Sequence, residues 1–285
     1  MIDKDNIVVK SKVNTLESNS NKIILGLFFG SFFFTICIIF LIFDFSSSSN
    51  KIISNSYPPV RKMKVSEQVK VDKIINSFTN HPIGIDISHF QGRINWSKVG
   101  LINDSISLAF VILRATMGKN SVDRRFKENW YSVKDSSIVM GAYHYYRPNE
   151  NSTKQANNFI ANVSLNNGDI IPILDIEQQS SIQSISRLRK GLLNWLKIIE
   201  EHYGVNPIIY TGDNFYNTHL NKPEFNKYPK WIANYNYISS PSTSDWDIWQ
   251  FSEAVKVDGI NELVDLNILA SDSLLLNKLI MKDNI

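Results

Sequence analysis

The 285-residue sequence contains a single cysteine, Cys37, and this scarcity excludes several kinds of chemistry. One cysteine cannot form a disulfide within the chain and cannot build a cysteine-based metal site. Because Cys37 lies inside an apolar run, no thiol nucleophile is available for chemistry in water either. The folded part of the chain must therefore gain its stability from its hydrophobic core.

Several sequence motifs for other chemistries are also absent. The sequence has no Gly-x-Ser-x-Gly nucleophile elbow, no His-Glu-x-x-His zinc motif and no phosphate-binding loop. The histidines are few and scattered along the chain, at His81, His89, His144, His202 and His219. We therefore expect no metal and no cofactor.

The C-terminal part of the chain lacks an excess of positive charge. Residues 81–285 carry 20 Lys/Arg and 21 Asp/Glu, whereas residues 1–80 carry ten and six, so their net charges are −1 and +4. A nucleic-acid binder needs a basic footprint, so we expect no nucleic-acid partner. The small basic excess at the N-terminus suits a membrane neighbourhood.

Residues 23–43 form a run of 21 positions without a charge, rich in Phe, Ile and Leu, after a polar tail at 1–22. About 20 such residues span a bilayer as a helix. A buried core helix would show a polar face, and a cleaved signal peptide would have a shorter apolar region and a small-residue cleavage site. The sequence therefore predicts an uncleaved signal anchor at 23–43, followed by a stem at 44–80.

The stem begins with the serine run Ser46–Ser49 and continues through Pro58 and Pro59. Its last part, Val65–Phe78, has a weak helical pattern that fits either a short helix or a flexible spacer.

From residue 81 to 285, short apolar runs alternate with helical patterns, which predicts parallel strands covered by helices. The expected strands are Ile83–Ser88, Leu108–Arg114, Val139–Tyr146, Asp169–Glu177, Pro207–Thr211, Lys230–Tyr235 and Asp247–Phe251. The expected helices are Trp96–Ile102, Arg124–Asp135, Thr153–Val163 and Ile182–His202. The helices thin out toward the C-terminus. We predict one α/β domain, an irregular, TIM-like (β/α) barrel, with its site at the carboxyl ends of the strands.

Acids and aromatic residues recur at those strand ends. Asp175 and Glu177 are two residues apart, so in a strand both side chains point to the same face, roughly 6–7 Å apart at the backbone. A pair of carboxylates suits glycosidic bond cleavage, in which one group gives a proton and another manages the positive sugar centre. The other polar or aromatic residues at strand ends are Asp86, Tyr143, Tyr145, Tyr210, Asn234, Tyr235, Trp249, Gln250 and Asp265.

Two residue types leave alternatives open. Any of Trp96, Trp231, Trp246 and Trp249 could stack on a sugar ring, but core packing is the commoner role of a single tryptophan. His89 and His144 either touch substrate or satisfy internal hydrogen bonds, and for His144 we favour the second role.

Seven blocks of the sequence resemble, in order, those of glycoside hydrolase family 25, the Chalaropsis-type lysozymes or N-acetylmuramidases. They are Gly84-Ile-Asp-Ile-Ser-His-Phe-Gln-Gly-Arg-Ile-Asn-Trp96, Tyr143-His-Tyr145, Pro172-Ile-Leu-Asp-Ile-Glu177, Tyr210-Thr211, Trp231-Ile-Ala-Asn-Tyr235, Trp249-Gln250 and Val264-Asp-Leu-Asn267. The resemblance covers about residues 83–268, which is essentially the whole predicted domain.

The resemblance implies hydrolysis of the β-1,4 bond between N-acetylmuramic acid and N-acetylglucosamine in peptidoglycan. It assigns Glu177 as the general acid, with Asp175, Asp86 and Asp265 as the other catalytic acids. Asp175 would orient or polarise the 2-acetamido group or a water. The residues expected to contact the glycan are Tyr143, Tyr145, Tyr210, Trp231, Tyr235, Trp249 and Gln250. An i, i+2 pair is compatible with retaining and with inverting geometry, and a substrate acetamido nucleophile would bypass the distinction.

The predicted substrate also bears on orientation. Lysines and arginines flank residues 23–43 on both sides, so the positive-inside rule does not settle the topology. Because peptidoglycan lies outside the membrane, we expect a single-pass protein with a cytoplasmic N-terminus and the barrel in the periplasm or at the cell surface.

One departure from the family pattern stands at Arg114-Ala-Thr-Met-Gly118, where the family often has Lys-Ala-Thr-Glu-Gly. Met117 removes an acid, which bears on subsite contacts rather than on the general acid. Two other functions remain open: a non-catalytic, membrane-tethered glycan-binding protein on the same barrel, and an enzyme acting on another amino-sugar polymer such as chitin. The longer acidic signature of chitinases is missing.

Overall fold

The structure is a computed structural model that describes residues 64–102, 106–134, 136–236 and 240–282. The predicted tail at 1–22, the predicted anchor at 23–43 and most of the predicted stem lie outside the described residues. Among the helices that the structure does describe, none is both long and apolar enough to cross a membrane.

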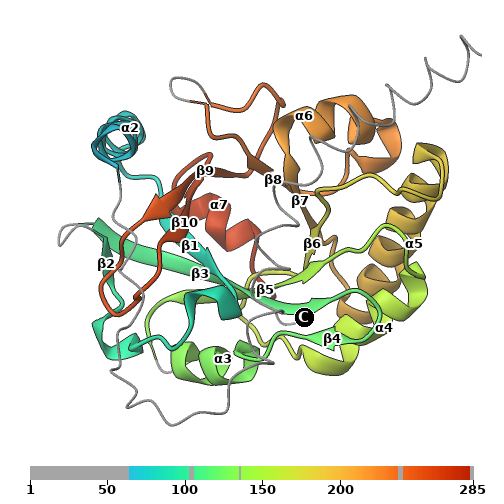
Figure 1. The fold of residues 1–285 in the computed structure, drawn as a ribbon, viewed down its shortest axis with the longest axis horizontal. Coiled ribbons are helices and arrows are strands. Elements are labelled where there is room, and N and C mark those ends of the chain that lie inside the picture. Colours follow the sequence, from blue (N-terminus) through green and yellow to red (C-terminus); the bar gives the residue numbers. More distant parts are fainter. Residues whose placement is uncertain (1–63, 103–105, 135, 237–239, 283–285) are drawn as a thin grey trace, which may run out of the picture. The chain divides into compact units, whose positions relative to one another are not determined.

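Eight strands form a closed barrel (Figure 1), in the order β1, β10, β9, β8, β7, β6, β5, β3, with β3 pairing back onto β1. The strands are β1 (Ile83–Ile87), β3 (Ile106–Met117), β5 (Val139–Tyr145), β6 (Ile173–Asp175), β7 (Ile208–Gly212), β8 (Lys230–Ala233), β9 (Ile248–Val255) and β10 (Val264–Leu269). Two short strands, β2 (Leu101–Ile102) and β4 (Ser121–Val122), pair with β3. The predicted barrel is confirmed.

The barrel is mixed rather than wholly parallel. β10 runs antiparallel to both of its neighbours, β9 and β1, whereas the other barrel pairs are parallel. An antiparallel pair needs only a loop to connect it, which explains why the helices thin out at this end of the chain. The predicted strand list omitted β10, because Asp265 and Asn267 interrupt its apolar pattern.

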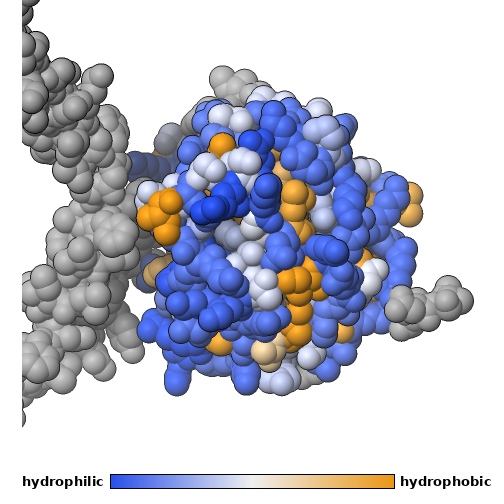
Figure 2. All heavy atoms as spheres, turned by 90° about the vertical axis from the view of Figure 1, so that its right-hand side faces the viewer, coloured by the Kyte–Doolittle hydropathy of each residue, from blue (hydrophilic) through white to orange (hydrophobic). Residues whose placement is uncertain are grey.

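Helices cover the outside of the barrel (Figure 1), chiefly α3 (Phe126–Lys134), α4 (Ser152–Asn162) and α5 (Ile185–Tyr203), where the sequence predicts them. Ser184 caps the N-terminus of α5, where its hydroxyl accepts from the Arg187 amide. Gly204 caps the C-terminus, and its φ of 73° favours glycine. Its apolar face is buried, and the surface on this side of the molecule is mostly hydrophilic (Figure 2). Shorter helices are η1 (His89–Gln91), α6 (Asp213–Phe215), η3 (Tyr216–Leu220), η4 (Pro223–Phe225) and α7 (Ser273–Lys278).

The helix predicted at Trp96–Ile102 is wrong in its second half. Only the 3-10 turn η2 (Trp96–Lys98) is helical, and Leu101 and Ile102 form β2. Ile102 pairs with Ile106 on β3 and is fully buried, so strand pairing supplies more burial than another helical turn would.

The segment with two alternatives, Val65–Phe78, is a helix in the structure. This helix, α2 (Val65–Ser77), buries Val71 and Ile74 and packs against β9. It therefore contacts the barrel directly.

Strand alternation divides the core into two layers. Side chains such as Phe110, Tyr210 and Trp231 fill the barrel interior, and α7 adds Leu276 to this cluster. Their sequence neighbours point outward into the larger layer beneath the helices. Gly84 has no side chain because a Cβ there would overlap the Phe110 ring inside the barrel.

Candidate active site

Four carboxylates come together at the carboxyl end of the barrel. Asp86 on β1 and Asp265 on β10 are directly opposite each other in the antiparallel register. Asp175 ends β6, and Ile176 after it is buried in the outer layer. Alternation therefore turns Glu177 to the same side as Asp175. The structure thus brings together all four acids that the sequence predicts.

Asp86 is held by two amides and by the neighbouring acid. Its Oδ2 accepts from Gln250 Nε2 at 2.7 Å and from Asn267 Nδ2 at 2.8 Å. Burial raises the pKa of Asp86, while hydrogen bonds from Asn267, Gln250 and Asp265 lower it in part. Burial and the charge of Asp86 raise the pKa of Asp265 well above its usual range. The two neighbouring carboxyl groups thus disfavour ionisation of both at once.

Asp175 lies at the floor of the cluster with only 4% of its surface exposed. Within the described residues, its Oδ1 is buried and accepts no hydrogen bond. Burial and the charges of Glu177 and Asp86 raise the pKa of Asp175 well above its usual range, although Arg114 opposes the shift. The Oδ1 atom therefore has unmet hydrogen-bonding capacity at the floor of the cluster.

Glu177 occupies the open side of the cluster. Desolvation and the charge of Asp86 raise its pKa, and Arg114 lowers it. The Glu177 side chain is nevertheless exposed to solvent, so desolvation contributes less here than at the buried Asp175. An exposed carboxyl group beside a negative cluster can hold a proton and still meet an incoming substrate.

Gln250 links two tyrosines to Asp86. The Oε1 of Gln250 accepts from the Tyr210 hydroxyl at 2.7 Å and from the Tyr235 hydroxyl at 2.5 Å. These two bonds fix the amide so that its NH2 group points to Asp86. Of the two tyrosines, Tyr235 is 42% exposed and Tyr210 only 7% exposed, so Tyr235 is the better placed to touch a ligand.

Tyr143 and Tyr145 on β5 face the same end of the barrel interior. Burial raises the pKa of both phenols, and the charge of Asp175 adds to each shift. The charge of Glu177 also raises the pKa of Tyr145. Both tyrosines remain neutral donors near neutral pH.

Two predicted glycan contacts do not reach an open surface. Trp249 is 1% exposed and packs in the outer layer, where its ring lies 5.5 Å from the Phe251 ring centroid. It points away from Gln250 because adjacent strand residues face opposite sides. Trp231 does face the interior, but it is 1% exposed and lies beneath Tyr210, donating from Nε1 to Asn267 Oδ1 at 2.8 Å. Both tryptophans are therefore packing residues beneath the site and have no surface open to a glycan.

His144, for which we favoured internal hydrogen bonds, indeed makes them. It is fully buried in the outer layer, 2.7 Å from Thr116 Oγ1 and 3.2 Å from Gln155 Oε1. Burial lowers its pKa to about 4, so the imidazole is neutral.

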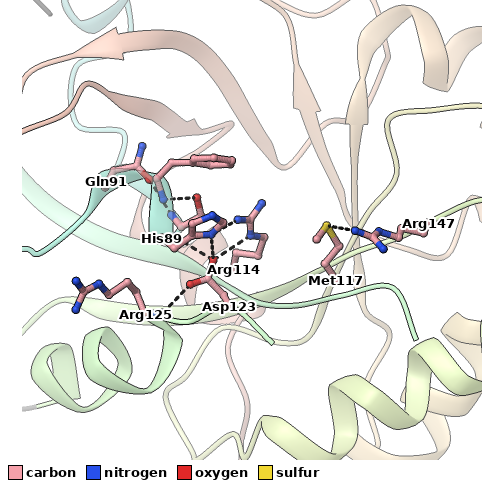
Figure 3. A network of polar contacts seen from close by, with 9 residues as sticks. His89, Gln91, Arg114, Met117, Asp123, Arg125 and Arg147 are labelled. Atoms are coloured by element: carbon pink, nitrogen blue, oxygen red, sulfur yellow. Dashed lines mark hydrogen bonds and ion pairs between the residues drawn. The ribbon is translucent and has the colours of Figure 1, made fainter. Parts of the chain in front are cut away.

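Asp123 forms a second acidic centre (Figure 3), and Arg114 lowers the pKa of this acid as it does for Asp175 and Glu177. Its Oδ2 accepts from the His89 amide at 3.0 Å and from Arg114 Nε at 3.1 Å, and lies 2.8 Å from His89 Nδ1. Its Oδ1 accepts from the Arg125 amide at 2.9 Å. Burial raises the pKa of Asp123, but these donors outweigh it and the pKa lies below the usual range. His89 thus has an internal partner.

Sequence reasoning missed two polar residues of the site. Asn267 donates to Asp86, and its spacing of two from Asp265 on one strand could have revealed it. Arg114 lowers the pKa of Asp175 and of Glu177, and it was noted only as a replacement for lysine. As for metals, no group of three or more His, Cys, Asp or Glu among the described residues is arranged to hold an ion.

A family model described as "Glycosyl hydrolases family 25" matches residues 85–260. Protein YegX of Escherichia coli K12 is 38% identical over 215 residues, which is 74% of this chain and 75% of YegX. Lysozyme M1 of Streptomyces globisporus is 33% identical over 201 residues, covering 65% of this chain and 66% of the lysozyme.

The barrel also resembles solved structures. The bacterial lysozyme from Streptomyces coelicolor superposes with a TM-score of 0.63 and 31% identity, covering 71% of this chain and 98% of the lysozyme. The matched segment contains Asp86, Asp175 and Glu177 and ends just before Asp265.

Proposed function

The chain belongs to glycosyl hydrolases family 25 and is a glycoside hydrolase, and from this premise we propose that it cleaves the β-1,4 bond between N-acetylmuramic acid and N-acetylglucosamine in peptidoglycan. The observation that carries the proposal is the convergence of the buried Asp86 and Asp175 with Asp265 and Glu177 at one barrel end. Relatives named lysozyme, such as lysozyme M1, support the same substrate.

We assign the proton donor to Glu177. Its exposed carboxyl group can reach a glycosidic oxygen, and desolvation together with Asp86 keeps a proton on it at a higher pH than usual. Protonation of the leaving oxygen lets the bond break as positive charge grows on the muramic acid ring.

We assign Asp175, at the floor of the site, to the stabilisation of that positive charge. Its unpaired Oδ1 suits a hydrogen bond from the 2-acetamido N–H of the sugar or from a water. A bond of this kind would orient the acetamido group toward the anomeric carbon. An Asp175 that orients the acetamido group serves a substrate-assisted route, whereas an Asp175 that holds and activates a water serves an inverting route.

The remaining residues would shape the subsite. Asp86 accepts from Gln250 and Asn267, and Gln250 in turn accepts from Tyr210 and Tyr235. We propose that Tyr235, with its exposed ring, lines the sugar subsite, and that Tyr143 and Tyr145 contribute neutral hydroxyl groups.

The proposal is tested by the products of peptidoglycan digestion. We expect the full chain to release fragments that, after borohydride reduction, carry muramitol at the reducing end in mass spectra. The Glu177→Gln variant serves as the control for contaminating activity. Glucosaminitol ends would contradict the bond assignment, and glycan binding without fragments would favour a binding protein.

We further propose that residues 23–43 anchor the enzyme in the membrane with the barrel outside. The charge-free run of 21 residues supports this proposal. Protease added to intact spheroplasts should then degrade the barrel, whereas a cytoplasmic marker protein stays intact. Protection of the barrel until the membrane is lysed would reverse the orientation.

A further inference from the structure

Helix α2 lies before the segment matched by the family model, which begins at residue 85, yet it touches the candidate site. The contact is made by Lys70, a lysine with only 3% of its surface exposed. Lysine is seldom buried without partners, because removing its charge from water is costly. Its partners therefore indicate what it does.

Two of those partners belong to Tyr235. The Nζ of Lys70 donates to the Tyr235 carbonyl at 3.1 Å, and it lies 5.9 Å from the centroid of the Tyr235 ring. One ammonium group thus contacts both the backbone and the aromatic face of the same residue.

The third partner is Glu67, one turn earlier on α2. Its Oε1 lies 3.3 Å from Lys70 Nζ and accepts from the Ser252 hydroxyl at 2.7 Å. Ser252 is fully buried on β9, two residues after Gln250. Glu67 therefore fixes the ammonium group of Lys70 relative to the strand that carries Gln250.

Tyr235 is held from two sides as a result. Its hydroxyl donates to Gln250, and its backbone is fixed by Lys70, while 42% of the residue stays exposed. It follows the end of β8 and belongs to none of the strands that the structure describes. A side chain ordered before the ligand arrives loses less entropy on binding.

We propose that Lys70 is a positioning residue for substrate binding, which holds Tyr235 in the orientation that lines the glycan subsite. This inference rests on the proposed function, because it assumes that Tyr235 contacts the glycan. It makes α2 a part of the site, although the helix lies outside the matched segment. The rival explanation is that Lys70 only fastens α2 to the barrel.

Glycan binding separates the two explanations. The parent protein is the full chain with Glu177→Gln, which should leave the ligand uncleaved. The ligand is the peptidoglycan tetrasaccharide of alternating N-acetylglucosamine and N-acetylmuramic acid, and its affinity is measured by calorimetric titration. We expect Lys70→Met to weaken binding about five- to tenfold and Lys70→Arg to restore it to within about twofold. Lys73→Met removes the same charge from an exposed position on α2 and should leave binding unchanged.

A second background tests whether Lys70 acts through Tyr235. In Tyr235→Ala, the Lys70→Met change should cost less than about twofold, because the residue that Lys70 positions is gone. An equal loss of affinity in both backgrounds, or a lowered melting temperature with unchanged affinity, would show that Lys70 only attaches α2 to the barrel. Lys70→Gln, which keeps a neutral donor, replaces Lys70→Met if that variant does not fold.

The outcomes also distinguish this inference from the function on which it rests. If the parent does not bind the tetrasaccharide, both are overturned. If the parent binds and the unmodified chain releases muramitol-ended fragments, but Lys70→Met binds as tightly as the parent, only the positioning role is overturned.

Discussion

Two buried aspartates near Arg114, Asp175 and Asp123, have opposite surroundings. Asp123 accepts hydrogen bonds on both oxygens, and its pKa lies below the usual range. The buried Oδ1 of Asp175 accepts no hydrogen bond from the described part of the chain, and burial with two neighbouring acids raises the pKa of Asp175 well above that range. The surroundings of Asp123 thus stabilise its carboxylate form, whereas those of Asp175 disfavour that form.

The difference separates a structural acid from a candidate catalytic one. A carboxylate with every oxygen paired stabilises the fold and has no capacity left for a ligand. A carboxylate crowded by other acids costs folding free energy, and its unmet hydrogen-bonding capacity becomes available to substrate. Substitutions in the two acidic centres should therefore have different effects.

The largest effect belongs to Glu177, the exposed acid of the unfavourable cluster. Glu177→Gln removes the proton donor while keeping the side-chain volume, so we expect kcat on peptidoglycan to fall about 10³-fold. Binding of the intact glycan should persist. Turbidity assays measure the rate, and Glu224→Gln, a change at an exposed acid far along the chain in η4, is the matched control. Unchanged turnover in Glu177→Gln would remove this residue from the acid role.

Asp123→Asn should have its main effect on stability. The change leaves Arg114 and His89 without their anionic partner, and we expect unfolding free energy at pH 7 to drop by about 3 kcal/mol. Because the folded pKa of Asp123 is lowered, its contribution is present above the ordinary value of 3.8 and is lost as pH falls through the folded pKa. Urea unfolding at several pH values measures this. A drop that stays constant down to acid pH would show that charge is not the cause.

Asp175→Asn should change stability with the opposite sign. The pKa of Asp175 is raised in the folded protein. The contribution of Asp175 to stability is therefore most favourable below pH 3.8, the ordinary aspartate pKa, and is lost as pH rises through the folded pKa. Asparagine does not titrate, so we expect the variant to be more stable by about 1 kcal/mol at pH 7. This gain should vanish near pH 3, which thermal melts across the pH range would reveal.

The smallest effect is expected at Met117, where the family often has glutamate. Met117 lines a cavity of about 220 Å³ beside Asp123, and its Sδ lies 3.5 Å from Arg147 Nη2 (Figure 3). Met117→Glu would place a carboxylate near Arg147, which already pairs with Glu150 at 3.2 Å. We expect kcat/KM to change less than about fivefold. A larger gain would show that this strand end contributes a subsite contact.

The sequence predicts the fold well where patterns are regular. Six strands and the helices α3, α4 and α5 lie close to their predicted positions, since each has an apolar run or a helical stripe. The seventh strand, predicted at Asp169–Glu177, is confined to β6 (Ile173–Asp175). It fails at β10, where Asp265 and Asn267 break the apolar run because the site needs polar groups there. It fails again at Leu101 and Ile102, whose strand pairing depends on β3 and not on local preference.

The four acids of the site follow from strand ends and family blocks, but the supporting residues do not. Trp249 sits in a matched block, and only strand alternation in the folded barrel shows that it faces away from Gln250. The bonds from His89 to Asp123 and from Lys70 to Tyr235 join segments far apart in the sequence, so no local pattern reveals them. Whether a carboxylate is satisfied is a property of the fold, which sequence spacing does not record.

The most direct test of the account measures peptidoglycan turnover and thermal unfolding on the same preparations of Asp175→Asn and Asp123→Asn. We predict that Asp175→Asn loses most of its turnover while its melting temperature rises by roughly 2–4 °C at pH 7. Asp123→Asn should melt at a lower temperature and keep the turnover of its folded fraction within about tenfold. An Asp175→Asn variant that stays active, or that melts earlier than the wild-type protein, would contradict the claim that this cluster exchanges stability for catalysis.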